Sequence, residues 1–254
     1  MALFPRWSNT VARITGAATL GAPAILLGLL WVFIRTPWVT NQNVQVEQPV
    51  QFDHRHHVRD EGIDCRYCHT TVESSATAGM PSTQICMSCH EQIWNKSAYL
   101  APVRQAYFED RPIQWQRVHN LPDFVYFNHS IHVNKGVGCA SCHGRVDEMP
   151  VMEQAAPLTM GWCLSCHRNP EPNLRPKEFI TSMTWKPSDM VKDQPSQGEG
   201  PNGTGHGAQG EVENQGRALN ALNVVAAADT AELGKALASQ YHVHSRTSCS
   251  TCHR

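Results

Sequence analysis

Cysteine and histidine are the residues best suited to chemistry in this chain, and they recur in one pattern. All ten cysteines fall in the sequence C-x-x-C-H, which occurs five times. This sequence is the attachment signal of a c-type haem, in which both thiols form thioethers with the porphyrin and the histidine binds the iron. The sites are Cys65-Cys68-His69, Cys86-Cys89-His90, Cys139-Cys142-His143, Cys163-Cys166-His167 and Cys249-Cys252-His253. The sequence therefore predicts five c-type haems.

Other chemistry is open to a single C-x-x-C pair, which can also hold zinc or act as a thioredoxin-like redox couple. Here every pair is followed by histidine, and no cysteine is left over for a disulfide or a zinc ligand. The pattern therefore favours haem. Haem c is attached outside the cytoplasm, in bacteria on the periplasmic side, so we expect this part of the chain to lie there.

Composition sets the fold class. The 254 residues carry a net charge of −1 and no basic run, which argues against nucleic-acid binding. From residue 50 onward there is about one attachment site per 40 residues, so porphyrins must supply much of the apolar core. No run of alternating polar and apolar residues predicts a sizeable sheet. We expect a multihaem cytochrome c, with mostly short helices and loops wrapped around five haems, little sheet and one N-terminal transmembrane helix.

The predicted membrane helix covers residues 14–34, which are 21 residues without a charge. A helix of that length spans about 31 Å, roughly the hydrocarbon thickness of a bilayer. A cleaved signal peptide is the alternative, but the run is longer than a usual signal core and no A-x-A-like cleavage site follows. We predict a single-pass anchor in the bacterial cytoplasmic membrane, with the haem domain on the periplasmic side.

The chain is expected to have four parts. Residues 1–38 form the N-terminal segment and the anchor, and residues 39–185 form the periplasmic haem domain. Residues 186–216 are rich in Gly, Pro, Gln and Asn, which is typical of a flexible linker. Residues 217–254 are expected to hold a helix, with Asp229 or Thr230 as a cap for its second segment, and the fifth haem site.

The haem domain contains an internal repeat of two dihaem units, residues 50–95 and 125–170. The first reads F-D-H-R-H-H, C-R-Y-C-H, G-M-P, C-M-S-C-H, and the second reads F-N-H-S-I-H, C-A-S-C-H, E-M-P, C-L-S-C-H. This arrangement resembles the small trihaem and tetrahaem cytochromes, in which F-x-H-x-x-H precedes the attachment sites. The resemblance implies that the two histidines of F-x-H-x-x-H are distal iron ligands.

Each distal histidine can be assigned by that resemblance. The first histidine of a motif serves the nearest downstream haem, and the second serves the other haem of the unit. His54 is thereby assigned to the iron of His69 and His57 to that of His90. The second unit assigns His129 to the iron of His143 and His132 to that of His167.

The fifth iron has several candidate second ligands. His119 comes first, followed by His242 or His244, which lie close to Cys249 in the sequence. A methionine of the second unit, Met149, Met152 or Met160, is a further alternative, and would raise the reduction potential. His56 is then a spare histidine, and His206 is expected to be solvated in the linker.

Two classes of function fit these features. One is an electron-transfer protein in which every iron has two protein ligands, and the other is a nitrite- or hydroxylamine-converting enzyme with one open iron. The supply of distal histidines favours electron transfer. Such reductases often replace the histidine of C-x-x-C-H by lysine at the catalytic haem, and no motif here does so. We predict no catalytic residue.

Two stretches carry a more specific resemblance: R-V-H-N-L-P-D-F-V-Y-F-N-H-S-I-H at 117–132 and G-W-C-L-S-C-H-R-N-P-E at 161–171. Together with the anchor and the last haem site they resemble the pentahaem cytochrome c subunit of bacterial alternative complex III, over about residues 10–190 and 241–254. The resemblance implies a haem chain that passes electrons from quinol oxidation towards a periplasmic acceptor.

Partners follow from the same resemblance. They are polytopic quinol-oxidising membrane subunits, an iron–sulfur subunit, and, as acceptor, a monohaem cytochrome c, another periplasmic electron carrier or a terminal oxidase. In that setting the chain is an electron-transfer subunit and not catalytic alone. The alternative is a stand-alone membrane-anchored multihaem quinol dehydrogenase, with a multihaem reductase containing one open haem as a more distant choice.

Overall fold

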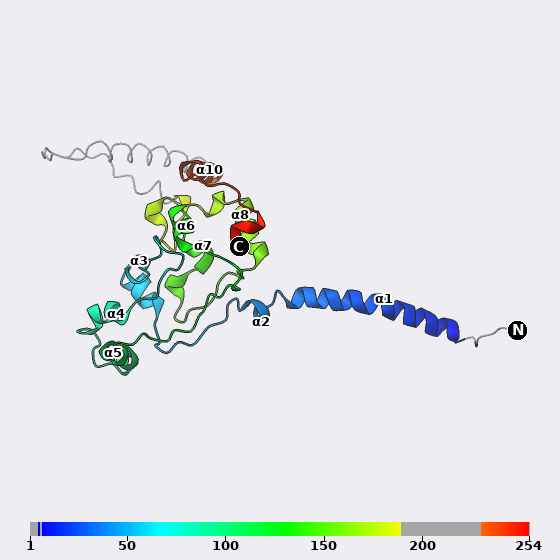
Figure 1. Cartoon of the computed structure of the whole chain (residues 1–254), viewed down its shortest axis with the longest axis horizontal. Helices are drawn as coiled ribbons and strands as arrows, with labels where there is room; N and C mark the ends of the chain where they lie inside the picture. Colours follow the sequence, from blue (N-terminus) through cyan, green and yellow to red (C-terminus); the bar gives the residue numbers. More distant parts are fainter. Residues whose placement is uncertain (1–4, 6, 189–229, 254) are drawn as a thin grey trace. The chain divides into compact units, whose positions relative to one another are not determined.

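The computed structural model describes residue 5 and residues 7–188 and 230–253. The chain divides into two compact units, Met1–Val44 and Gln45–Arg254. Helices and loops make up both units (Figure 1), and the described residues form no strand, only two isolated bridges, Gln45 with Glu153 and Val137 with Leu174. The predicted fold of short helices and loops with little sheet is therefore confirmed.

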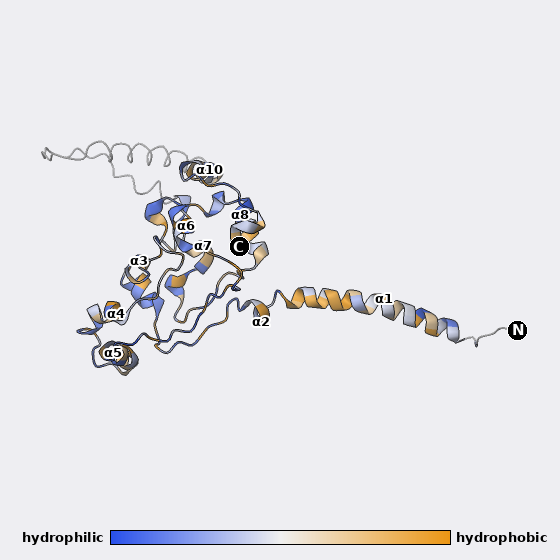
Figure 2. Cartoon of the chain, viewed as in Figure 1, coloured by the Kyte–Doolittle hydropathy of each residue, from blue (hydrophilic) through white to orange (hydrophobic). Residues whose placement is uncertain are grey.

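Unit 1 consists of helix α1, Ser8–Phe33, and the short helix α2, Pro37–Thr40. Helix α1 has 26 residues and contains Pro23, and no residue in it is buried. Figure 2 shows apolar residues gathered in its C-terminal half, where the uncharged run lies. The helix is long and apolar enough to cross a membrane, a property that a signal sequence near an N-terminus shares.

Arg35 stands just after α1 and closes its C-terminal end. Its Nη1 donates a hydrogen bond to the Trp31 carbonyl oxygen over 2.7 Å, and its guanidinium lies 3.7 Å from the centre of the Trp31 ring. A cation at this end of a helix satisfies a free carbonyl and complements the helix dipole. Arg35 thus stabilises the C-terminal end of α1.

Unit 2 is built from short helices joined by loops. The α-helices are α3 Cys65–Cys68, α4 Thr83–His90, α5 Ala101–Phe108, α6 His129–Asn134, α7 Ala140–His143, α8 Met160–Arg168, α10 Thr230–Gln240 and α11 Cys249–Cys252. The described residues of the unit also form one π-helical turn, η1 Arg55–Asp60, and four 3₁₀ turns, η2 Ala98–Leu100, η3 Val146–Glu148, η4 Glu171–Asn173 and η5 Lys177–Phe179. Each C-x-x-C-H motif therefore lies on a short helix of its own, as predicted.

Polar side chains start three of these helices. Asp64 accepts a hydrogen bond from the Arg66 backbone N–H at the start of α3, and Thr159 accepts one from the Trp162 N–H at the start of α8. Asn128 does the same for α6. Such caps satisfy backbone donors that have no partner within the helix, which matters most when a helix has only four to nine residues. The caps place Cys65 and Cys163 at fixed points of their helices.

Helix α10 is held by an apolar cluster. Leu233 and Leu237 are one helical turn apart, fully buried, and packed with Leu174 and Ala238. Only this part of the predicted 217–240 helix can be compared, since residues 217–229 lie outside the described residues, as does the predicted linker apart from residues 186–188. A second cluster, Val50 with Met87 and Val103, packs α4 against α5.

Gly234 lets α10 approach the turn η4 closely, and this contact predicts the effect of a substitution. A Cβ at Gly234 would lie 2.7 Å from the Glu171 carbonyl oxygen, a backbone atom that cannot move aside. We expect Gly234→Ala to lower the free energy of unfolding by about 1–3 kcal/mol through overpacking. Thermal unfolding followed by far-UV circular dichroism measures the loss.

Gly161→Ala is the matched control, because it also lies in a helix and a Cβ there would meet no atom within 4 Å. Alanine has the higher helix propensity, so this variant should be neutral or slightly stabilised. Equal unfolding temperatures for the two variants would contradict the proposed close contact.

Candidate haem-binding sites

The two F-x-H-x-x-H motifs fold into nearly the same arrangement. Phe52 meets His54 edge to face with ring centroids 4.7 Å apart at 84°, and stacks on His57 at 4.3 Å and 25°. Phe127 meets its first histidine at 4.7 Å and 87°, and stacks on the second at 4.6 Å and 27°. The sequence repeat is therefore also a geometric repeat, in which one phenyl ring orients two imidazoles.

Histidines of these motifs face histidines of the attachment sites. Ring centroids are 6.1 Å apart for His57 and His90, and 6.0 Å apart for His132 and His167. His129 and His143 lie 6.3 Å apart. Two imidazole nitrogens bound about 2.0 Å from one metal ion on opposite sides place their ring centroids about 6 Å apart. Three of the four predicted ligand pairs thus have a spacing that fits an iron between them.

Hydrogen bonds to backbone carbonyls orient most of these rings. The Nδ1 atom of His69 lies 2.8 Å from the Gly79 carbonyl oxygen, and that of His90 lies 3.0 Å from the Ile93 oxygen. A carbonyl oxygen can only accept, so Nδ1 carries the hydrogen and Nε2 keeps its lone pair. Metal-binding histidines are commonly oriented in this way. The same contact occurs at His57, His129, His132, His167 and His253, at 2.7–2.9 Å.

His54 and His143 complete the set in different ways. The Nδ1 atom of His54 is buried without a hydrogen-bond partner among the described residues. Burial, with the neighbouring His69 and His57, lowers the pKa of His54 to about 4. Burial also lowers the pKa of His143 to about 3, and its Nδ1 lies 3.2 Å from Nε2 of His119. Both rings are therefore neutral near pH 7, the form that binds a metal.

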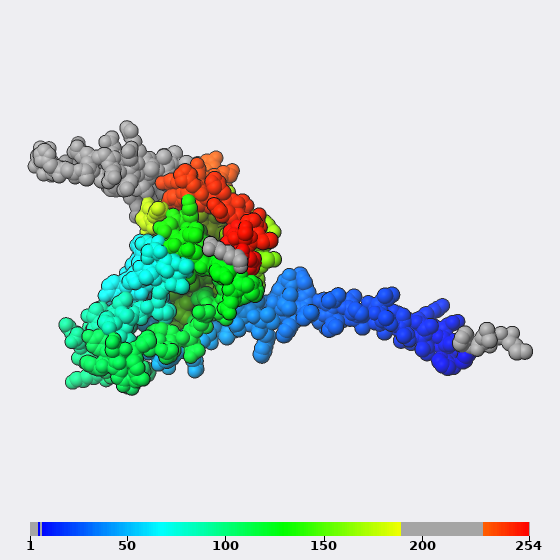
Figure 3. All heavy atoms as spheres, in the orientation of Figure 1, coloured from blue at the N-terminus to red at the C-terminus, as the bar shows by residue number. Residues whose placement is uncertain are grey.

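The fifth attachment site is fastened to the rest of unit 2 by backbone contacts. His253 Nδ1 donates to the Phe124 carbonyl oxygen over 2.9 Å, and the Tyr126 N–H donates to the Cys252 oxygen over 2.8 Å. His167 Nδ1 reaches the carbonyl oxygen of Arg246. Figure 3 shows these C-terminal residues, in orange and red, lying against green residues of the same unit. The last motif thus belongs to unit 2.

Neighbouring cysteines show how the five motifs follow one another in space. Cys65 and Cys139 share a hydrogen bond that raises the pKa of the first thiol and lowers that of the second. Burial raises the pKa of the Cys86, Cys142 and Cys163 thiols, that of Cys142 to about 11. A neighbouring thiol adds to each of these shifts. The neighbours are Cys68 for Cys86, Cys166 for Cys142 and Cys252 for Cys163.

These contacts place the motifs in a row that differs from their order in the sequence. The row runs from Cys86–His90 through Cys65–His69, Cys139–His143 and Cys163–His167 to Cys249–His253. Helices α4, α3, α7, α8 and the chain end follow one another in this order in Figure 1. The described residues also contain no group of three or more His, Cys, Asp or Glu side chains that could hold a metal ion by themselves.

Comparisons with known proteins agree with this geometry. Residues 50–101 match the family model of cytochrome c7 and related cytochromes c. The matched stretch holds the first F-x-H-x-x-H motif and the first two attachment sites. The chain contains a multihaem cytochrome c domain. Haem is the cofactor of such a domain.

A curated relative extends the likeness. The chain is 32% identical over 126 residues to the menaquinone reductase multihaem cytochrome c subunit of Nitratidesulfovibrio vulgaris strain Hildenborough. The alignment covers 48% of this chain and 59% of that protein. The chain thus matches a little over half of the relative's length.

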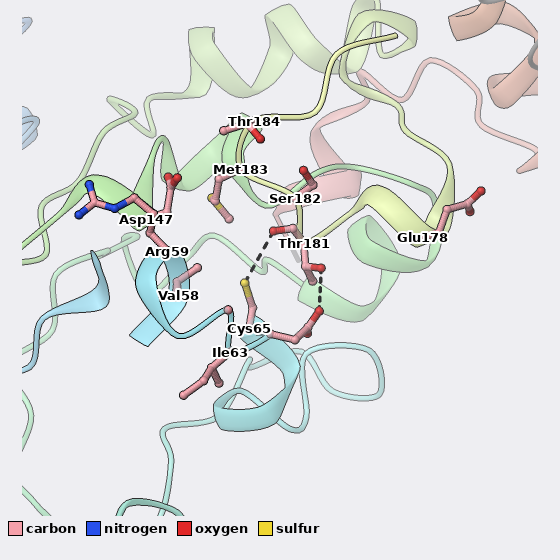
Figure 4. Close-up of a pocket in the computed structure, with 12 residues that line it drawn as sticks. Val58, Arg59, Ile63, Cys65, Asp147, Glu178, Thr181, Ser182, Met183 and Thr184 are labelled. Atoms are coloured by element: carbon pink, nitrogen blue, oxygen red, sulfur yellow. Dashed lines mark hydrogen bonds between the residues drawn. The ribbon is translucent and has the colours of Figure 1, made fainter. Parts of the chain in front are cut away.

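A pocket of about 290 Å³ borders the first attachment site of the cytochrome domain. Cys65 lines it, and its Sγ contacts the Thr181 carbonyl oxygen, while the Thr181 hydroxyl donates to Asp64 over 2.9 Å (Figure 4). The Arg66 guanidinium, which also binds Asp64, holds the pKa of that carboxyl at about 2. Because an attachment cysteine forms its wall, the pocket belongs to the haem site.

Several functional groups of the cytochrome domain could not be found from motif reading. They are backbone carbonyls, which every residue type has and which no motif can therefore mark. Two of them, those of Arg246 and Phe124, come from distant segments. Gly79 is the exception, since its φ of +77° and the 2.7 Å approach to Thr71 that a Cβ would make both require glycine. The position of this glycine directly before Met-Pro was the sequence signal that could have marked it.

Other predicted ligands remain predictions. The structure gives His119 a contact with His143. Met149 is buried and Met160 is exposed. His56 stacks on Trp94 with ring centroids 6.1 Å apart. His206 lies outside the described residues.

The paired histidines predict the effect of removing one of them. In His132→Phe the iron bound by His167 loses its second nitrogen, so one haem of the five should become high-spin and bind carbon monoxide. Visible and EPR spectra of the purified protein measure both changes. His57→Phe should behave in the same way at the His90 iron, because the two pairs have the same geometry.

His56→Phe is the control, since this histidine lies between two predicted ligands but faces Asp60 and Glu61 at the surface. It should leave all haems low-spin. A fully low-spin spectrum in both His132→Phe and His57→Phe would exclude the assigned pairs.

Proposed function

We propose that this chain is a membrane-anchored pentahaem cytochrome c that carries electrons between quinone chemistry in the membrane and a periplasmic carrier. Five c-type haems are held by the ten cysteines of the C-x-x-C-H motifs. His69, His90, His143, His167 and His253 are the proximal ligands, and His54, His57, His129 and His132 are distal ligands. No residue is assigned a catalytic role.

The observation that carries this proposal is the set of three histidine pairs with centroids 6.0–6.3 Å apart. Each ring of these pairs has its Nδ1 hydrogen-bonded to another group, which leaves Nε2 to face its partner. Two protein ligands at an iron are typical of electron-transfer haems, whereas a substrate-binding haem keeps one position open. The pairs therefore support transfer and not catalysis.

When bound, the haems supply one-electron Fe(III)/Fe(II) chemistry. The chain's own residues do the rest. The cysteines bind each porphyrin covalently, the backbone carbonyls orient the imidazoles, and Phe52 and Phe127 fix pairs of rings against rotation. The row of motifs has His90 at one end and His253 at the other. A row with two ends suits a protein that receives electrons at one and delivers them at the other.

Membrane attachment is the second part of the proposal. Helix α1 is proposed to stay on the protein as a single-pass anchor in the bacterial cytoplasmic membrane, with unit 2 on the periplasmic side. Ala17, Gly21, Ala24 and Gly28 lie along one face of α1, and small residues let a second membrane helix approach closely. This face supports a partner with membrane helices.

The proposed setting is alternative complex III, in which polytopic subunits oxidise quinol and an iron–sulfur subunit is present. The electrons would leave to a monohaem cytochrome c, another periplasmic carrier or a terminal oxidase. The likeness of residues 117–132 and 161–171 to the pentahaem subunit of that complex supports this choice. A stand-alone multihaem quinol dehydrogenase is the alternative.

The relative favours a second candidate, in which electrons flow the other way. Its printed name describes a subunit of a menaquinone reductase, so the partner complex of this chain would reduce quinone and not oxidise quinol. The same five haems and the same anchor would serve either direction. Only the direction and the periplasmic partner separate the two candidates.

Purification in mild detergent, with gel analysis, haem quantification and assays in both directions, tests the proposal. We expect five low-spin haems per chain, co-purifying polytopic and iron–sulfur subunits, and reduction of the haems by a quinol analogue. Faster reduction of menaquinone by periplasmic electron donors would favour the second candidate. A high-spin haem that binds nitrite or cyanide in the unmodified protein would contradict the electron-transfer assignment.

Removing one attachment site tests the haem number. The double variant Cys249→Ala/Cys252→Ala lacks both thioether positions of the last site, so we expect four covalent haems per chain. The pyridine haemochrome assay counts them. Ser248→Ala/Ser250→Ala removes two neighbouring hydroxyls, one just before the motif and one at a variable position within it, and should keep all five haems. Five haems in the cysteine variant would refute the fifth site.

A further inference from the structure

His143 is the proximal histidine whose Nδ1 faces a side chain. At the other four attachment sites this atom lies 2.8–3.0 Å from a backbone carbonyl oxygen. At His143 the partner is Nε2 of His119, 3.2 Å away, with ring centroids 4.4 Å apart at 71°. The described residues give this Nδ1 no carbonyl partner. One of the five sites is thus oriented by a different kind of group.

The internal repeat explains why this site differs. In the first unit, His69 donates to the carbonyl of Gly79, the residue before Met-Pro. The backbone there has φ +77°, which glycine adopts without strain. In the second unit the residue before Met-Pro is Glu148, which ends the turn η3 and does not have a positive φ. The carbonyl used in the first unit therefore has no counterpart at His143, where a side chain takes its place.

We propose that His119 is a positioning residue for the haem of His143, accepting the Nδ1–H of His143 through its own Nε2. This inference rests on the proposed role of His143 as a proximal ligand. With Nε2 of His143 bound to iron, Nδ1 must carry the hydrogen, so Nε2 of His119 must accept it. The hydrogen of the His119 ring then lies on Nδ1.

This arrangement leaves His119 without a lone pair for an iron of its own. One ring nitrogen accepts from His143 and the other carries the hydrogen. His119 therefore cannot both accept the hydrogen of His143 and bind the fifth iron, which is the role that the sequence suggests. The fifth iron is then left to His242, His244 or a methionine.

The hydrogen bond has a consequence for the iron. A ligand imidazole that donates its second N–H to an acceptor is a more basic ligand, and loss of such a partner typically changes metal affinity 10–100-fold. A more basic ligand stabilises Fe(III) over Fe(II). Removing the acceptor at His119 should therefore make the haem of His143 easier to reduce.

The test is a redox titration of the full-length, haem-loaded protein with His119→Leu. Leucine removes the acceptor, so one of the five reduction equilibria should shift about tenfold towards Fe(II), a rise of about 59 mV for one electron. All five haems should stay low-spin. His119→Gln supplies a side-chain oxygen that can accept the same hydrogen, and should restore most of the potential. His56→Phe, at a histidine without a ligand role, should leave every potential unchanged.

Three outcomes would overturn the inference. Unchanged potentials in His119→Leu would show that the contact does not act on the haem. A high-spin haem that binds carbon monoxide in the same variant would show that His119 is itself an iron ligand. His119→Gln serves as the test if it is the variant that matures. A shifted potential or a high-spin haem in it would overturn the inference, while an unshifted potential with low-spin haems would support the acceptor role.

The proposed function and this inference fail differently. Fewer than five haems, or a high-spin haem, in the unmodified protein would contradict the haem assignments themselves. Five low-spin haems in the unmodified protein, with no response to His119→Leu, would contradict only the role of His119.

Discussion

An imidazole has two nitrogens, and it can offer only one of them to a metal while the other is held in place. In unit 2 this constraint is met mostly by the backbone, because seven histidines point Nδ1 at a carbonyl oxygen. The loops between the short helices are therefore structural parts of the haem sites. Their course is set by where a carbonyl must lie, which explains how a domain with so little regular structure can orient so many rings.

The two dihaem units are interlocked as well as repeated. The backbone N–H groups of His129 and Ser130, at the start of α6, donate to the carbonyl oxygens of Ala76 and Ser75 in the first unit, and Asn134 reaches the Glu73 oxygen. His129 Nδ1 also bonds to Ala76. The second unit thus takes part of its ligand orientation from the first. The second unit would therefore not be expected to hold all its imidazoles in place alone.

Sequence reasoning predicted the fold class of short helices and loops, since covalent motifs and a repeated spacing are local features. The pairing of His57, His129 and His132 with their partners stays a prediction, which the spacing of the rings supports. Sequence reasoning did not predict the spatial order of the motifs. That order depends on long-range packing such as Cys65 against Cys139, which no local pattern encodes. The contact of His119 with His143 was missed for a similar reason, because it replaces a backbone carbonyl lost between two otherwise similar units.

The hydrogen-bond partners of the proximal histidines also differ in how far away they lie along the chain. His90 and His69 find theirs 3 and 10 residues on, and His143 finds its partner 24 residues back. His167 and His253 depend on groups 79 and 129 residues away. Closing longer loops costs more chain entropy and takes place later in folding. Maturation of the protein should therefore have a direction: the first three sites can acquire their final geometry early, whereas the last two must wait until residues 246–253 are in place.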